Sequence, residues 1–211
     1  ITAFAVVSGI YFASDRDKRT SLWWIFIIAG FAGSRELKVP KSGTRPTSDR
    51  VREAIFSALE ARDVIEGARV LDLFAGSGAL ALEALSRGAV SVTMVEKNPQ
   101  AGALLRTNAD LIRNAGKLDA LATRVVIASV ASYLGNPSSE LFDIVFIDPP
   151  YELSEEEVTH ALELLIPHLA EDAEVVLERS TRTGLPALPA GIELDKSKAY
   201  GETTIHWISA V

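Results

Sequence analysis

The four residues Asp148-Pro149-Pro150-Tyr151 directly follow an apolar run over residues 141–147, and their types suit the capture of a planar amine. The exocyclic amine of guanine, adenine or cytosine is a poor nucleophile, because its lone pair is delocalised into the ring. The Asp148 carboxylate and the Pro149 carbonyl can accept its two N–H groups, and the two prolines deny the backbone other conformations. Tyr151 can stack on a base that has left its helix. A rigid turn without a ligand is the competing interpretation.

A glycine-rich segment, Asp72-Leu-Phe-Ala-Gly-Ser-Gly-Ala-Leu80, lies between an expected strand and an expected helix. Its glycines let a ligand approach the backbone, and the start of the helix offers free amide donors. Glu96 ends the next expected strand, where a carboxylate can accept both hydroxyls of a ribose. The segment therefore predicts a nucleoside site, and its expected residues are Asp72, Phe74, Ala75, Gly76, Ser77, Gly78, Glu96 and Asp148.

The residue types around this loop favour S-adenosylmethionine over a dinucleotide. Residues 76–81 also satisfy the loose dinucleotide pattern, so an NAD-dependent oxidoreductase stays open. Asp72, however, would repel a pyrophosphate, whereas it can hold an ammonium group, and a sulfonium also prefers acidic surroundings. Asp72 could equally cap the turn without a ligand. Methyl transfer from a sulfonium needs no strong base and chiefly requires in-line positioning, which the two motifs together would supply.

A basic segment precedes both motifs. Between residues 34 and 52, six basic side chains stand against two acidic ones, a local charge of +4 in a chain whose net charge is -7. A basic patch on an acidic body suits a polyanion held at one edge, although a solvated basic loop is an equally good interpretation. The residues expected to contact the RNA backbone are Arg35, Lys38, Lys41, Arg45, Arg50 and Arg52. Pro150 and Tyr151 are expected to contact the target nucleobase.

Composition narrows the possible chemistry. The chain has no cysteine, which excludes disulfides, thiolate metal sites and a thiol nucleophile. Methylation of cytosine C5 by the covalent route is thereby disfavoured, and the composition is compatible with a reducing cytoplasm. The three histidines, His160, His168 and His206, are not close in sequence to metal-type ligands, so we expect no metal site.

The chain divides into three expected parts. Residues 1–26 are an unassigned extension. The apolar runs at residues 1–13 and 21–33 are each shorter than the ~18 residues that span a bilayer, so we expect no membrane partner. Residues 27–46 form a small basic segment. Residues 47–211 are long enough for one ordinary domain with a substantial core.

Strands and helices alternate through this last part. Thr47 or Ser48 can cap a first helix that extends to about residue 59. Expected strands cover residues 69–74, 91–95, 124–128, 142–147 and 173–177, expected helices cover 76–87, 99–114 and 154–169, and residues 191–196 and 203–209 can form a closing antiparallel pair. This order predicts an α/β fold with a doubly wound, mainly parallel sheet, whose ligands bind at the carboxyl ends of the strands.

From about residue 27 onward, the chain resembles the bacterial 16S ribosomal RNA guanine-N2 methyltransferase family. The glycine motif and Asp148-Pro-Pro-Tyr151 occur in many amino-methyltransferases, whereas the segment at residues 43–53 is more specific to this family. The resemblance lies in Ile27-Ile-Ala-Gly30, Gly43-Thr-Arg-Pro-Thr-Ser-Asp-Arg-Val-Arg-Glu53, Val70-Leu-Asp-Leu-Phe-Ala-Gly-Ser-Gly-Ala-Leu80, Glu83-Ala-Leu-Ser-Arg-Gly-Ala89, Val95-Glu96, Asp148-Pro-Pro-Tyr151 and Tyr200-Gly201.

The resemblance implies a seven-stranded Rossmann-like methyltransferase sheet with a small N-terminal β-hairpin. It implies S-adenosylmethionine as donor and a guanine of small-subunit RNA as acceptor. The modest charge of the basic segment favours the assembled 30S particle over naked RNA. We further expect a monomer in the cytoplasm, with Asp148, Pro149 and Tyr151 as catalytic residues. Related enzymes often carry Asp or Asn where Ala128-Ser129-Val130 stands, so adenine recognition falls to Ser129 or to backbone groups. Methylation of adenine N6 or of protein glutamine, and a non-catalytic RNA-binding module, remain as alternatives.

Overall fold

The structure is a computed structural model, and it describes residues 23–39, 48–136 and 140–211. The predicted sites Lys41 and Arg45 therefore lie outside the described residues. The strands are β1 (Trp23–Phe26), β2 (Glu36–Val39), β3 (Arg69–Asp72), β4 (Ser91–Glu96), β5 (Thr123–Ile127), β6 (Phe142–Ile147), β7 (Leu169–Ser180), β8 (Ile192–Tyr200) and β9 (Thr203–Ala210). The α-helices are α1 (Asp49–Ala61), α2 (Ala79–Ser86), α3 (Pro99–Gly116), α4 (Val130–Leu134) and α5 (Glu155–Leu165).

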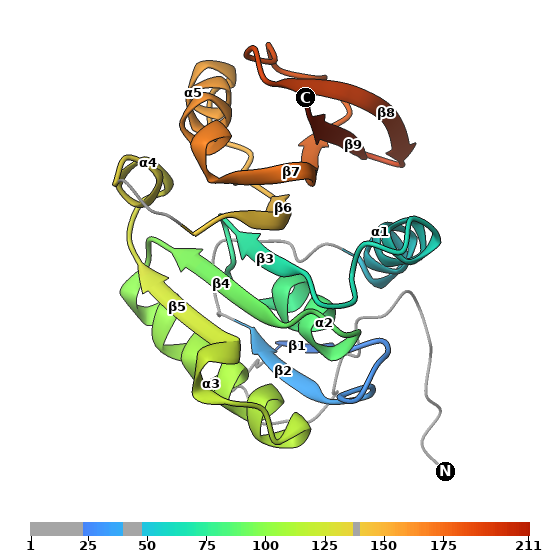
Figure 1. Cartoon of the computed structure of the whole chain (residues 1–211), viewed down its shortest axis with the longest axis vertical. Helices are drawn as coiled ribbons and strands as arrows, with labels where there is room; N and C mark the ends of the chain where they lie inside the picture. The colour runs from blue at the N-terminus through green and yellow to red at the C-terminus, as the bar shows by residue number, and fades with distance from the viewer. Residues whose placement is uncertain (1–22, 40–47, 137–139) are drawn as a thin grey trace, which may run out of the picture.

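Within the described residues, seven strands form one sheet in the order β5-β4-β3-β6-β7-β9-β8 (Figure 1). The pairs from β5 to β7 are parallel, whereas β9 is antiparallel to both of its neighbours. Strands β4 and β5 follow β3 on one side of the sheet. The chain then crosses back, and β6 pairs with the other side of β3. This reversal confirms the predicted doubly wound sheet and makes the crevice beside β3 the expected ligand site.

Two apolar layers cover the sheet, one on each face. The first layer joins α1, α2, α3 and the hairpin to one face, and the rings of Phe56 and Phe146 lie 5.8 Å apart within it. The second layer joins α4 and α5 to the other face. Alternate residues of the central strands enter opposite layers, as Phe146 and Ile147 do, because successive side chains of a strand point to opposite faces.

The helices begin where the sequence offers a cap. Ser48 caps α1, Asn98 caps α3, and Ser154 forms a capping box with Glu157 at the start of α5. In each case a side-chain oxygen accepts an N–H group that the first turn leaves unpaired. Of the two caps predicted for the first helix, the structure uses Ser48.

The N-terminal hairpin is held to the domain by buried polar groups. The Glu83 carboxylate accepts the N–H groups of Ile28 and Ala29, at 2.6 and 3.0 Å, and Ser86 Oγ accepts the N–H of Ala32. Pairing of Trp23 with Val39 begins the hairpin four residues before the predicted boundary at residue 27. The boundary was wrong because it divided the apolar run that supplies β1 and the loop after it.

The last part of the sheet differs in length from the prediction. Strand β7 runs from Leu169 to Ser180, whereas residues 173–177 were predicted, and α5 ends at Leu165 before a short 3-10 turn that contains Pro167. Pairing with β9 extends β7 as far as Ser180. That partner lies some thirty residues further along the chain, so local periodicity cannot indicate it.

Among the described residues, no helix combines the length and apolar character needed to cross a bilayer. The same residues contain no cluster of three or more His, Cys, Asp or Glu side chains placed to hold a metal ion. His168 is buried and its Nε2 lies 2.9 Å from the carbonyl oxygen of Leu134, which gives this side chain a place in the core.

Candidate active site

The carboxyl ends of β3, β4 and β6 bring the two predicted motifs to one edge of the sheet (Figure 1). Asp72, the last residue of β3, pairs with Met94 on one side and with Phe146 on the other. Glu96 therefore lies two residues beyond one partner of Asp72, and Asp148 two residues beyond the other. Segments that are far apart in the sequence meet here because their strands are neighbours.

The glycine loop is fixed by its two neighbouring strands. The N–H of Leu73 donates to the carbonyl of Phe146 and that of Ala75 to the carbonyl of Val95, both at 3.0 Å. Gly76 and Gly78 have φ values of +52° and +82°, which few residues other than glycine adopt. A Cβ on Gly78 would lie 2.6 Å from Leu105 Cδ1, whereas one on Gly76 would meet only the carbonyl oxygen of Phe74, at 4.0 Å. Gly78 is thus needed for packing, and Gly76 leaves the backbone open to a ligand.

Two carboxylates border this loop in different environments. Glu96 accepts the N–H of Gly76 at 3.0 Å and that of Asn98 at 2.7 Å, so it joins the loop to the start of α3. Asp72 is buried, and its Oδ1 has no hydrogen-bond partner among the described residues. Burial raises the pKa of Asp72 to about 7, although N–H groups of Phe74 and Ala81 act in the opposite direction. A buried oxygen of this kind fits a cationic ligand group.

The Asp148-Pro149-Pro150-Tyr151 segment forms the connection from β6 to α5. Pro149 is buried, Asp148 and Pro150 are half-buried, and Tyr151 is 64% exposed. The N–H of Leu153 donates to the Pro150 carbonyl at 3.0 Å, which closes the turn just before the Ser154 cap. The aromatic ring is therefore accessible, and its stacking on a base stays a prediction.

The remaining predicted cofactor residues, at positions 74, 75, 77 and 129, differ in how deeply they are buried. Phe74 packs against the layer that contains α5, while Ala75 and Ser77 are buried in the loop. Ser129 is exposed and caps α4, because its hydroxyl oxygen accepts the N–H of Ser132 at 3.1 Å. The hydroxyl hydrogen of Ser129 can still be donated to a ligand. The recognition of adenine by Ser129 stays a prediction.

The basic side chains of residues 34–52 that the structure describes are not all exposed. Arg35 and Lys38 are exposed on the hairpin and Arg50 is exposed on α1. Arg52, in contrast, is fully buried, and its guanidinium donates to Asp49 at 2.7 Å and to the carbonyl of Phe26 at 2.6 Å. The prediction that Arg52 contacts phosphates is therefore wrong, since its charge is used to hold α1 against β1.

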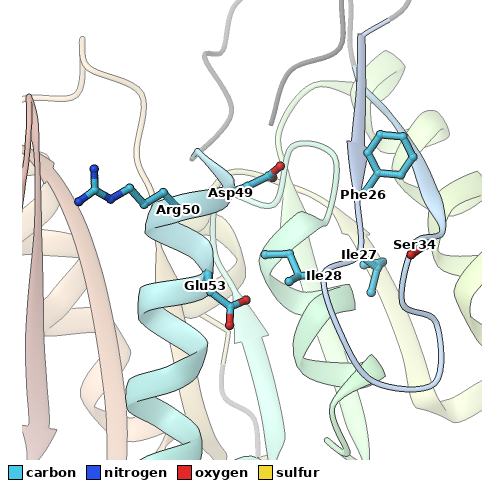
Figure 2. A pocket seen from close by; sticks show the side chains of 7 residues that line it. All are labelled: Phe26, Ile27, Ile28, Ser34, Asp49, Arg50 and Glu53. Carbon is cyan, nitrogen blue, oxygen red and sulfur yellow. The ribbon is translucent and has the colours of Figure 1, made fainter. Parts of the chain in front are cut away.

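A cavity of about 730 Å³ lies between α1 and the hairpin, away from the two motifs. Phe26, Ile27 and Ile28 line it from the hairpin side, and Figure 2 shows Ile28 pointing toward α1 and Arg50 pointing away from the hairpin. The acidic lining residues are already paired, Asp49 with Arg52 and Glu53 with Arg87. The candidate site is therefore the edge of the sheet, where the glycine loop and Asp148 meet, and not this cavity.

Asn108 on α3 is a functional candidate that the sequence did not suggest to us. Its side chain exchanges two hydrogen bonds with the backbone of Lys38, at 3.0 and 2.9 Å, and donates a third to the carbonyl of Ser77 at 2.8 Å. It thereby links the hairpin to the glycine loop while itself 1% exposed. The available signal was a polar residue in the apolar face formed by Leu105, Ala109 and Ile112.

Replacing Asn108 with alanine should weaken both the fold and the loop. Loss of the amide leaves buried backbone groups of Lys38 and Ser77 unpaired, which costs about 1–3 kcal/mol in the free energy of unfolding. Denaturant unfolding measures this loss, and Thr107→Ala on the exposed side of the same helix is the control. Equal stability of the two variants would show that Asn108 does not hold the loop.

The strand order and the glycine loop beside Asp148-Pro-Pro-Tyr151 define the class of this protein, which is that of the Rossmann-like methyltransferases. Within this class, the family described as conserved hypothetical protein 95 matches residues 25–209. The chain belongs to that family.

Individual relatives agree with this assignment. The chain is 40% identical to the ribosomal RNA small subunit methyltransferase D of Escherichia coli strain K12, over 84% of this chain and 86% of the relative. The solved structure of the protein yhhF from Escherichia coli is 35% identical with a TM-score of 0.72, and covers 89% of this chain and 98% of its own. The hypothetical protein TTHA0928 of Thermus thermophilus is 33% identical, also with a TM-score of 0.72, over 87% and 98% of the two chains. The family resemblance seen in the sequence motifs is confirmed.

Proposed function

We propose that this chain transfers a methyl group from S-adenosylmethionine to the exocyclic N2 amine of a guanine in small-subunit ribosomal RNA. The observation that carries the proposal is the meeting of the glycine loop, Glu96 and Asp148 at the switch point of the sheet. The name of the relative from Escherichia coli supports ribosomal RNA as the substrate. The choice of guanine N2 rests on the motif resemblance.

The residues around the glycine loop fit the proposed donor. The Oδ1 of Asp72, which has no hydrogen-bond partner within the described part of the chain, suits the ammonium group, and the Glu96 carboxylate retains lone pairs for two ribose hydroxyls. The open left-handed backbone at Gly76 lets a ligand lie against the loop. When bound, S-adenosylmethionine supplies a methyl group on a positively charged sulfur.

The residues after β6 would prepare the amine for attack. The Asp148 carboxylate and the Pro149 carbonyl accept its two N–H groups, which turns the lone pair of the nitrogen toward the donor. Tyr151 stacks on the ring and keeps the base out of its helix. Catalysis then rests on positioning, because attack on a sulfonium needs no strong base and the proton of the amine can leave to water after transfer.

The proposed acceptor is RNA within an assembled 30S particle, and we expect the chain to act on it as a monomer in the cytoplasm. The basic segment carries a local charge of only +4, and Arg52 is buried within it. Capture of naked RNA depends on the number of exposed phosphate contacts, so a weakly basic surface favours a substrate whose own proteins assist binding.

A direct comparison of two substrates tests this proposal. The purified chain is incubated with labelled donor and either undermethylated 30S particles or naked small-subunit RNA. We expect transfer to RNA, faster on the particles. Faster transfer to naked RNA would overturn the choice of acceptor, and absence of transfer to either, in a chain that binds the donor, would overturn the proposed function.

The pKa of Asp72 should make donor binding depend on pH. An ammonium group beside Asp72 favours its charged form, so the dissociation constant should rise as pH falls below about 7, by up to about tenfold per pH unit. Calorimetric titration with S-adenosylhomocysteine between pH 5.5 and 8.5 measures this dependence. Asp72→Asn should bind more weakly and with little change across this range, and an unaltered pH profile in that variant would show that Asp72 is not the responsible group.

The raised pKa of Asp72 also affects the free energy of unfolding of the ligand-free chain. Because the pKa of Asp72 is higher in the folded chain than its ordinary value of 3.8, the folded state holds its proton over a wider pH range than the unfolded state. The contribution of Asp72 to the free energy of unfolding therefore falls as pH rises from about 4 to about 7.

A further inference from the structure

We propose that Glu178 selects guanine at this site by accepting its N1–H, next to the amine that Asp148 accepts. The inference rests on the proposed function and deepens it by assigning the residue that sets base specificity. Glu178 is near the carboxyl end of β7, the strand beside β6, and was not among the residues that the sequence motifs indicated.

Strand register places Glu178 beside Asp148. Ile147, the last residue of β6, pairs with Leu177 of β7, so Asp148 directly follows β6 at the position beside Glu178, which is still within β7. Neighbouring strands lie about 4.8 Å apart. The two carboxylates therefore stand at adjacent positions on the edge of the sheet that carries the glycine loop.

Side-chain alternation places Glu178 on the same face as Asp148. Val176, two residues before Glu178, and Phe146, two residues before Asp148, belong to the layer under α1, whereas Leu177 and Ile147 belong to the opposite layer. Ile205, which pairs with Glu178 across β9, also belongs to the layer under α1. Glu178 is half-buried, as expected for a group at the open end of that layer.

Guanine is the base whose hydrogen-bonding edge matches two neighbouring carboxylates. It presents N1–H and the N2 amine side by side, and both are donors. Adenine presents a lone pair at N1 beside its amine, and cytosine presents one at N3. A carboxylate accepts hydrogen bonds and cannot donate them when ionised, so Glu178 would favour guanine and repel the other two bases.

The base 2-aminopurine separates the two contacts. It keeps the amine at position 2 but has a lone pair at N1 in place of the N–H. The unaltered chain should therefore methylate a particle with guanine at the target position at least tenfold faster than one with 2-aminopurine there, because a site built for an N–H rejects an analogue that lacks it.

Glu178→Gln tests the residue itself. The amide can donate to N1 of 2-aminopurine, whereas its neutral oxygen accepts the N1–H of guanine more weakly than a carboxylate does. This variant should therefore lose about tenfold of the rate on guanine, and its preference for guanine over 2-aminopurine should shrink by at least that factor. Its affinity for S-adenosylhomocysteine should not change. Glu178→Asp, which keeps the charge, should retain the preference for guanine even if its rate falls.

Glu174→Gln is the matched control. Glu174 lies on the same strand and face, four residues earlier, and pairs with Arg62 at the other end of the sheet. It should change stability without changing base preference. A guanine preference that persists in Glu178→Gln, or an unaltered chain that accepts 2-aminopurine as well as guanine, would overturn the assignment of Glu178. Transfer to adenine N6 instead of guanine N2 would contradict the proposed function itself.

Discussion

Replacing Asp148 with alanine is expected to lower the rate of methyl transfer by a factor of about 10³, at the upper end of the loss of about 10²–10³ that follows removal of one positioned hydrogen-bonding group from an active site. The side chain follows β6 beside the glycine loop, where it can accept an N–H of the target amine. Without it, the lone pair of the amine stays delocalised in the ring. The measurement is the single-turnover rate with saturating donor and substrate particle.

Asp148→Asn is the matched variant for this prediction. Its amide keeps one oxygen that can accept an N–H, so it should lose only about tenfold, since a neutral hydrogen bond is weaker than a charge-assisted one. Donor affinity should change much less than the rate in both variants. A rate for Asp148→Ala within tenfold of the unaltered chain would show that the carboxylate does not act on the amine.

Replacing Glu96 with alanine is expected to weaken donor binding by about 10²-fold, or about 3 kcal/mol. The carboxylate accepts the N–H groups of Gly76 and Asn98, so its loss loosens the glycine loop and also removes the proposed acceptor of the ribose hydroxyls. Hydrogen bonds to a charged group contribute about 1.5–3 kcal/mol each. Calorimetric titration with S-adenosylhomocysteine measures the change.

Two further variants separate a local effect from a general loss of structure. Glu96→Gln keeps one acceptor oxygen and should lose about tenfold. Lys97→Ala changes an exposed neighbour and should bind as the unaltered chain does. If Glu96→Ala folds and binds the donor with unchanged affinity, Glu96 is not part of the donor site.

Much of the site could be predicted because its backbone requirements are local. Gly76 and Gly78 need left-handed φ values, and the apolar run at β6 ends at the rigid Asp148-Pro149 pair, so the sequence marks both turns. The alternation of strands and helices then fixes which edge they share. The bounds of β6, Phe142–Ile147, were predicted without error.

The net charge of residues 34–52 does not reveal that Arg52 is buried. Counting basic residues over a window does not tell which side of a helix each one occupies. Helical spacing does carry that information, because Arg52 stands three, four and seven residues before Ile55, Phe56 and Leu59, all of them buried.

The sequence motifs did not indicate the candidate residues whose positions depend on segments far away in the chain. Asn108 depends on Lys38 and Ser77, and the position of Glu178 depends on the register between β6 and β7. Such contacts follow from strand pairing and helix packing over long sequence separations. Single-residue propensities contain no information about them.

The most direct measurement is nucleoside analysis of small-subunit RNA after reaction of undermethylated 30S particles with the purified chain and labelled S-adenosylmethionine. We expect the label in N2-methylguanosine, and we expect it to be lost with Asp148→Ala. Label in N6-methyladenosine, in protein, or in no product of a chain that binds the donor would contradict the assignment of this site to guanine N2.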